Sequence, residues 1–364
     1  MSGHNPKKRL GTSDDESFSP VIQNTPPLPA IDFGQVGQQA PELLDTPYDD
    51  LPEADAVVIT WAEAEWAALE HVFCSSGSSM PYSAHNEGSW SGWQKYDRDL
   101  PYGAPSGWTY WGDYRLVKIQ GRTVLLFKSN THLDWPGESY LEDLIGKFVS
   151  YVKPSLILSI GTAGGAETQD HVGTVRAVRA GTLYEQGEPS SQWPNYSSSW
   201  SAVWTILEQP GFGQLVFPVP TTQSDLQALC DQFNQHYGTG YSLSDLNPGN
   251  LDMGDPSPQI YDMTRSSTSL LTTSTFVVGT TSGSYQSFAC IEMDDAVIGK
   301  VCESSGTSFG FVRNVSDPVQ NQNLPSKVQG NWGSTIYDAY GFYTSYNGAL
   351  AAWAVLVGQF SSNP

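Results

Sequence analysis

The stretch "PSLILSIGTAGG" (residues 154–165) is the clearest buried strand in the chain, and it ends in a glycine loop. Its continuous apolar run is typical of a strand that is covered on both faces. A second apolar run, "AVVIT" at 56–60, is followed at 63–73 by residues with helical spacing. Such strand–helix alternation predicts an α/β fold with a mixed, mostly parallel central β-sheet flanked by helices.

The same alternation continues along the rest of the chain. Helical patterns are found at 138–152, 224–237 and 336–360, and a strand-to-helix unit is found at 289–306. Strand patterns cover 114–120, 122–129, 172–185, 274–283 and 308–319. No internal repeat is present.

The chain divides into an arm and one domain. Residues 1–52 are rich in Pro, Asp, Gln and Ser, which predicts a disordered or draped N-terminal arm. Residues 53–364 form a single predicted domain, with long insertions rich in aromatic residues, Ser and Gly at about 75–112 and 187–260.

Composition excludes several classes of function. The net charge is −21, from 38 acidic and 17 basic residues, and such a surface repels nucleic acids and anionic membranes. The four cysteines have no CxxC spacing, which favours buried thiols in a reducing compartment. The chain has no apolar run of membrane-spanning length, and its first residues lack a signal peptide's apolar segment. We therefore expect a cytoplasmic protein that binds neither nucleic acid nor membrane.

Polar residues follow four of the predicted strands. They are "TWAEAE" (60–65), "GTAGG" (161–165), "EMDD" (292–295) and "SDP" (316–318). Ligands of such sheets bind beyond the carboxyl ends of the strands, so the fold would gather these residues at one edge. Each segment alone also has an ordinary explanation, as an acidic first turn of a helix or as a turn.

Together, the order and spacing of these segments resemble the nucleoside phosphorylase and nucleosidase superfamily. The resemblance is greatest to the methylthioadenosine/S-adenosylhomocysteine nucleosidase branch. "WAEAE" is similar to that branch's A-M-E-E-E, "IGTAGG" to T-G-S-A-G-G, "IEMDDA" to V-E-M-E-A, and "VRNVSD" to V-R-x-I-S-D. It spans roughly residues 54–181 and 274–360.

The resemblance implies two catalytic carboxyl groups. The Asp of the Ser-Asp motif, here Asp317, would donate a proton to N7 of the departing purine, and Ser316 would orient it. Breaking an N-glycosidic bond builds negative charge on the base, which a carboxylic acid can neutralise. Glu65, with Glu63 as second choice, would hold the attacking water.

The resemblance also implies the residues that bind substrate. Met293 and Asp294 would cradle the ribose, with Glu292 beside them, although the family has Glu where this chain has the shorter Asp294. The glycine loop would contribute Gly161 and Thr162, the latter near the nucleophile. A purine would stack on Tyr285 or Phe288.

Three functions remain open. A nucleosidase acting on an adenosine-type purine nucleoside or derivative is favoured, because 60–66 and 128–138 lack the arginines with which the family's phosphorylases gather phosphate. A purine nucleoside phosphorylase and a non-catalytic protein that binds a nucleoside or nucleotide are the alternatives.

This chemistry requires no metal or cofactor. A homo-oligomer based on dimers or trimers is expected, with the apolar closing helix available for an interface. Arg313 is predicted to be structural, and His132 to be a surface residue.

Overall fold

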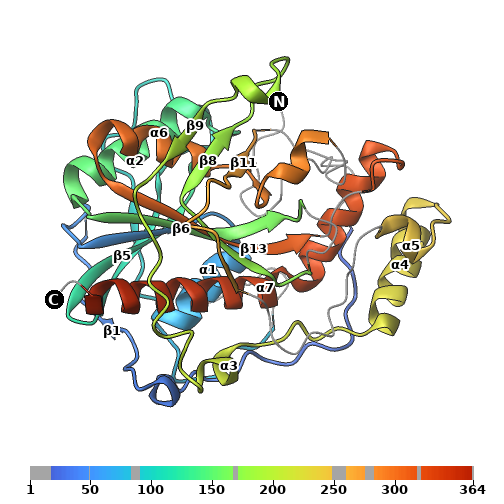
Figure 1. Cartoon of the computed structure of the whole chain (residues 1–364), viewed down its shortest axis with the longest axis horizontal. Coiled ribbons are helices and arrows are strands. Elements are labelled where there is room, and N and C mark those ends of the chain that lie inside the picture. Colours follow the sequence, from blue (N-terminus) through green and yellow to red (C-terminus); the bar gives the residue numbers. More distant parts are fainter. Residues whose placement is uncertain are drawn as a thin grey trace.

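One mixed β-sheet forms the centre of the protein (Figure 1). The computed structural model describes residues 18–48, 50–82, 91–166, 171–247, 260–274, 283–317 and 321–362. The central strand β6 (Leu156–Gly164) pairs in parallel with β2 (Ala56–Thr60) on one side and with β13 (Ser308–Asp317) on the other. Strand β2 pairs in parallel with β5 (Arg122–Ser129).

Antiparallel pairs extend this parallel centre on both sides. The other strands are β1 (Glu42–Leu43), β3 (Gln94–Tyr96), β4 (Gly112–Ile119), β7 (Val175–Val178), β8 (Ala180–Leu183), β9 (Asn195–Ser197), β10 (Ile260–Asp262), β11 (Leu270–Thr272) and β12 (Ile291–Glu292). The helices are α1 (Glu63–Phe73), α2 (Glu138–Lys147), α3 (Phe212–Leu215), α4 (Gln223–Tyr237), α5 (Leu243–Leu246), α6 (Asp295–Ser305) and α7 (Ser326–Ser362). The predicted mixed α/β sheet flanked by helices is confirmed.

Helices cover both faces of the sheet. Alternate residues of β2 point to opposite faces, so Ala56 and Val58 join the core beneath α1 and α7, while Val57 and Ile59 join the core beneath α2 and α6. All four of these side chains are fully buried. This two-sided burial explains why β2 is uniformly apolar in sequence instead of alternating.

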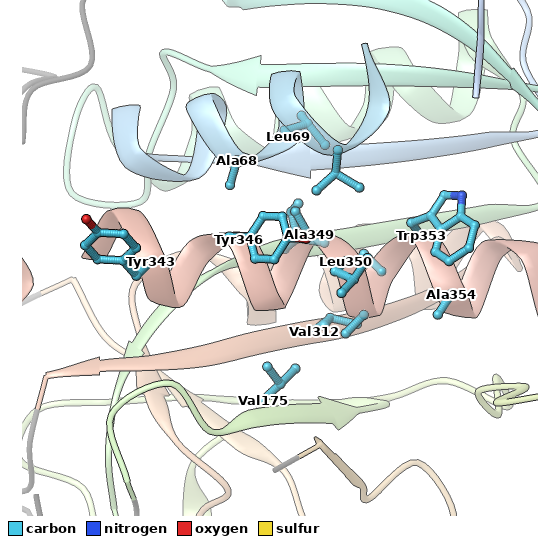
Figure 2. Close-up of a cluster of buried hydrophobic side chains, with 14 of the residues drawn as sticks. Ala68, Leu69, Val175, Val312, Tyr343, Tyr346, Ala349, Leu350, Trp353 and Ala354 are labelled. Carbon is cyan, nitrogen blue, oxygen red and sulfur yellow. The ribbon is translucent and has the colours of Figure 1, made fainter. Parts of the chain in front are cut away.

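Helix α7 is the main packing element of one face (Figure 2). It lies between α1 and β13, and Tyr346, Leu350 and Trp353 are buried along it. It begins ten residues earlier than the predicted start at 336, because Trp332 packs edge-on against Phe233 of α4. Trp332 lies outside the helical pattern found at 336–360, so the sequence did not indicate the additional turns at the start of α7.

The chain itself covers α7. The Tyr343 hydroxyl donates to the Pro26 carbonyl at 2.8 Å, and the Tyr346 hydroxyl donates to the Leu215 carbonyl at 2.7 Å. Phe33 packs against Trp353 with ring centroids 4.3 Å apart. Segments from the predicted arm and from the second insertion therefore occupy the apolar surface that we expected to be available to another subunit.

Two predicted strands differ from the structure. The pattern at 172–185 forms two short strands, β7 and β8, and the pattern at 289–291 yields only the two residues of β12. The predicted strand at 274–283 lies almost wholly outside the described residues. Within the described ranges, no helix is long and apolar enough to cross a membrane.

Candidate active site

The carboxyl ends of the central strands bring together residues that are far apart in sequence. Strand β13 runs beside β6, so Asp317 lies opposite Gly164, and Asn314 lies opposite Thr162. Glu65, in the first turn of α1, reaches across β2 and accepts hydrogen bonds from Thr162. The edge predicted from the strand-end residues therefore exists as a cluster of buried side chains.

Glu65 is a buried carboxylate with donors on both oxygens. Its Oε2 accepts from the Thr60 hydroxyl at 2.9 Å and from the backbone N–H groups of Trp61 and Ala62 at 2.8 Å. Its Oε1 accepts from the Thr162 N–H and hydroxyl, both at 2.7 Å. Burial alone would raise the pKa of Glu65, but Arg313 and these hydrogen bonds outweigh it and lower that pKa.

Arg313 binds acidic groups and other acceptors within this cluster of buried side chains. Its guanidinium makes a forked contact with Asp295, one branch of which is 2.7 Å from Nε to Oδ2. It also donates to Glu292 Oε2 and Ser159 Oγ, each at 3.1 Å, and to the Thr162 carbonyl at 3.3 Å. The rigid guanidinium suits this task, because its donors lie in one plane and meet several acceptors at once.

The carboxyl group of Glu292 is engaged in hydrogen bonds within the protein. Its carboxyl group accepts from the Thr272 hydroxyl and from the backbone N–H groups of Asp294 and Asp295, which begin α6. Burial and the nearby Asp295 raise the pKa of Glu292 to about 8. Its side chain thereby fixes the turn that presents Met293, which is half-buried, and Asp294.

Asp294 is held by the loop that follows β5. Its Oδ1 accepts from the Leu133 N–H at 2.9 Å, and its Oδ2 lies 3.3 Å from Nδ1 of His132. Burial raises the pKa of Asp294 well above its usual range. His132 is only 9% exposed, so the expectation of a surface histidine is wrong. The only signal in the sequence was its place after a strand end.

Asp317 ends β13 beside the glycine-rich end of β6, where residues 161–164 continue the strand instead of forming the predicted loop. The Ser316 hydroxyl donates to Asp317 Oδ1 at 2.7 Å, and both side chains are buried. The register of β13 shifts between Val315 and Asp317, which directs Asp317 Oδ2 toward Gly164. Gly161 is needed for packing, since a Cβ there would collide with Arg313 and Glu65.

The two predicted stacking residues belong to a separate aromatic cluster. The ring of Phe288 stacks on Trp193 with centroids 6.2 Å apart, and Trp193 meets Tyr184 edge-on at 4.9 Å. Tyr285 packs against the same cluster. Trp193 comes from the second insertion, outside every motif, so sequence reasoning had no way to connect it with this edge.

Lys128 is a second feature that the motifs did not indicate. It is the last residue but one of β5, is buried, and donates to the Ser129 carbonyl at 2.7 Å. Burial lowers the pKa of Lys128, while the charges of Asp113, Glu63, Glu65 and Asp294 oppose that shift. The cation therefore faces a group of acids. Among the described residues, no group of three His, Cys, Asp or Glu side chains could hold a metal ion.

Similarity to known proteins is limited to the three-dimensional structure. No protein-family model and no curated protein sequence matches the chain. Solved structures do match over most of its length. The chain is similar in fold to nucleosidases.

Three of these structures illustrate the similarity. Futalosine hydrolase of Helicobacter pylori is 9% identical, with 83% of this chain and 96% of that one covered and a TM-score of 0.43. The methylthioadenosine/S-adenosylhomocysteine nucleosidase of Neisseria meningitidis, in complex with methylthio-immucillin-A, is 12% identical (83% and 98% covered, TM-score 0.45). The S-adenosylhomocysteine nucleosidase of Streptococcus pyogenes is 13% identical (86% and 99%, 0.44). Similarity at this level carries no argument about chemistry, which must come from the chain's own residues.

Proposed function

We propose that the protein is a nucleosidase that hydrolyses the N-glycosidic bond of a purine nucleoside or derivative, of the adenosine type. The observation that carries the proposal is the pairing of Asp317 with Ser316 beside the glycine-rich end of β6, at the same edge as Glu65 and Asp294. Acids on that edge suit a reaction that builds positive charge on the sugar and negative charge on the base.

In the proposed reaction, Asp317 donates its proton to N7 of the purine as the bond between C1′ and N9 breaks. The Ser316 hydroxyl, bound to Oδ1, orients the carboxyl group. A water molecule then attacks C1′ from the opposite side, and its oxygen forms the new bond to the sugar. The free base and the free sugar are the products.

Glu65 acts on the water through Thr162 in this proposal. Both Glu65 oxygens receive hydrogen bonds from the chain, and the Thr162 hydroxyl donates one of them to Oε1. That hydroxyl keeps lone pairs that can accept a hydrogen bond, and Thr162 is partly exposed, whereas Glu65 is buried. Thr162 is thus the group that would accept a hydrogen bond from the water and position it.

The distribution of cations supports hydrolysis over phosphorolysis. Arg313 is bound to Asp295 and Glu292, and Lys128 is surrounded by carboxylates. A phosphate dianion would have to displace these acids or lie beside them, and like charges at such distances repel strongly. A neutral water molecule meets no such obstacle.

Release of free base from a nucleoside panel tests the proposal. The protein is incubated with adenosine, methylthioadenosine, inosine and ATP, with and without inorganic phosphate. We expect base release that does not depend on phosphate. Strict dependence on phosphate would instead identify a phosphorylase, and ligand binding without any release would identify a non-catalytic nucleoside-binding protein.

A further inference from the structure

The turn that begins α6 is where the resemblance to nucleosidases implied a cradle for the sugar, but its acids are already engaged by the protein. Glu292 accepts from the Thr272 hydroxyl, and its Oε2 accepts from the Asp294 N–H at 2.7 Å and from Arg313 at 3.1 Å. The Glu292 side chain is only 1% exposed. A sugar hydroxyl could therefore reach this carboxyl group only if the hydrogen bonds around Arg313 were broken.

Asp294 is likewise engaged, by the loop that follows β5. Its Oδ1 accepts from the Leu133 N–H at 2.9 Å, and its Oδ2 lies 3.3 Å from Nδ1 of His132. The Asp294 side chain is 5% exposed, and Met293 is the only residue of 292–295 that is not buried. A sugar that approaches this turn would therefore meet a thioether, which is a weak acceptor, before it meets a carboxylate.

Glu65 offers no substitute at the same edge. Its Oε2 accepts three hydrogen bonds and its Oε1 accepts two, all from within the protein. A carboxylate has about four lone-pair positions, so this group has no remaining capacity for a sugar hydroxyl. Glu65, Glu292 and Asp294 thus hold parts of the chain to one another, and none of them is presented to a ligand.

Recognition of a ribose depends on acceptors of this kind. A site that hydrogen-bonds a hydroxyl group of its substrate rejects the analogue without that group by about 10⁴-fold or more, because polar groups of the protein are then left unpaired. A hydroxyl group that the protein does not bind gives no such advantage, and it loses its hydrogen bonds to water in the site. The 2′-oxygen also withdraws electrons from C1′, so positive charge develops there more readily when the 2′-hydroxyl is absent.

We infer that the protein does not select for the 2′-hydroxyl, and that purine 2′-deoxyribonucleosides are substrates at least as good as purine ribonucleosides. The inference rests on the proposed function and deepens it by naming the sugar. The electrons of the C1′–N9 bond leave with the base, which Asp317 protonates at N7. One water molecule is consumed: its hydroxyl group goes to C1′, and its remaining proton replaces the one that Asp317 has given to the base.

Base release from adenosine and from 2′-deoxyadenosine tests the inference on the wild-type protein. The two nucleosides carry the same base, so a difference in kcat/KM reports only on the 2′ position. We expect kcat/KM for 2′-deoxyadenosine to match or exceed that for adenosine, within an error of about threefold. A preference for adenosine of more than about threefold would overturn the inference.

An Asp294→Asn variant tests the inference from the side of the protein, with Asp143→Asn, at an exposed position of α2, as the matched control. The amide keeps an oxygen for the Leu133 N–H but loses the charge and one acceptor. Because Asp294 holds the loop and not the sugar, any fall in turnover should be equal for the two nucleosides. The ratio of their kcat/KM values should stay within about threefold of the wild-type ratio. The control should keep both the ratio and the rates.

The outcomes separate the inference from the function on which it rests. A loss confined to adenosine in the Asp294→Asn variant would mean that this carboxyl group binds the 2′-hydroxyl, and the inference would be wrong. If the variant does not fold, the comparison of the two nucleosides on the wild type still decides. Release of base from neither nucleoside would refute the proposed function together with the inference, whereas a preference for adenosine would refute the inference alone.

Discussion

At the scale of single residues, a network of buried charges shapes the proposed active site. Arg313 joins Asp295 and Glu292, Glu65 accepts hydrogen bonds from Thr162 of β6, and Asp294 accepts one from the loop after β5. Buried charges are costly to leave unpaired, so each member depends on its partners. How readily each acid can accept a further hydrogen bond or a proton depends on how many of its lone pairs already accept hydrogen bonds from the protein.

Replacing Asp317 by Asn should stop base release and leave the fold intact. The amide oxygen can still accept the Ser316 hydrogen bond, but the side chain has no acidic proton for N7. We expect kcat to fall by at least about 100-fold. Turnover and the thermal melting temperature are the measurements. Turnover at the wild-type rate in a folded variant would refute the assigned role.

Replacing Arg313 by Met should destabilise the protein strongly. Asp295 would remain fully buried without its partner, at a cost of about 3–5 kcal/mol in the free energy of unfolding. Adding Asp295→Leu should recover part of that loss, because it removes one of the two buried carboxyl groups with which Arg313 pairs. Urea unfolding measures both. As the control, Arg122→Met removes an exposed pair with Asp55 and should cost only about 0.2–1 kcal/mol.

At the scale of elements, the packing of α7 depends on segments far from it in sequence. Residues 28–36 pack in the core with α7 and α1. Leu28 is fully buried and pairs with Met80, and His71 contacts the Pro29 carbonyl at 3.0 Å. This described part of the predicted arm therefore contributes to the core. The apolar surface of α7 requires that cover, since a helix that is apolar nearly all round is stable only when buried.

Truncating the packed side chains of this segment should therefore reduce stability. We expect Leu28→Ala to cost about 2–5 kcal/mol and Phe33→Ala about 3–5 kcal/mol in the free energy of unfolding. Val21→Ala is the control, because Val21 is 70% exposed, and it should change stability by less than about 0.5 kcal/mol. Denaturant unfolding measures all three. Equal, small effects would mean that the segment contributes little to the fold.

At the scale of the whole molecule, the buried acids make stability depend on pH. The pKa of Glu292 rises from 4.5 to about 8 on folding, and that of Asp294 also rises. Between these two values, the folded protein holds a proton that the unfolded chain has lost. Raising the pH through this interval therefore favours unfolding. Glu65 acts in the opposite direction, since its lowered pKa stabilises the fold above its own titration.

Thermal melting as a function of pH should show this balance. We expect the melting temperature to be highest near pH 5 and to fall as the pH approaches about 8, the value to which burial raises the pKa of Glu292. Glu292→Gln carries no titrating group and should flatten the fall. Glu208→Gln, at an exposed position, should leave the curve unchanged. A melting temperature that rises steadily from pH 5 to 8 would contradict the prediction.

Local sequence patterns determined the elements. Unbroken apolar runs predicted β2 and β6, helical spacing predicted α1 and α4, and the polar residues at the strand ends predicted one common edge. These features depend on the spacing of apolar residues and on the direction of the strands, and both can be inferred from residues that are near one another in the sequence. They placed the segments that contain Glu65, Thr162 and Asp317 at that edge, whereas the resemblance to nucleosidases singled out these three residues.

Only the tertiary structure decided how these residues are held. His132, Lys128 and Trp193 follow no motif. Lys128 lies in β5 itself, whereas His132 is brought to its partners by a loop and Trp193 by an insertion. Likewise, α7 is covered by its own chain, a result of contacts between residues more than a hundred positions apart. Periodicity reports only on near neighbours, whereas burial and charge pairing depend on distances that are set once the whole chain is packed.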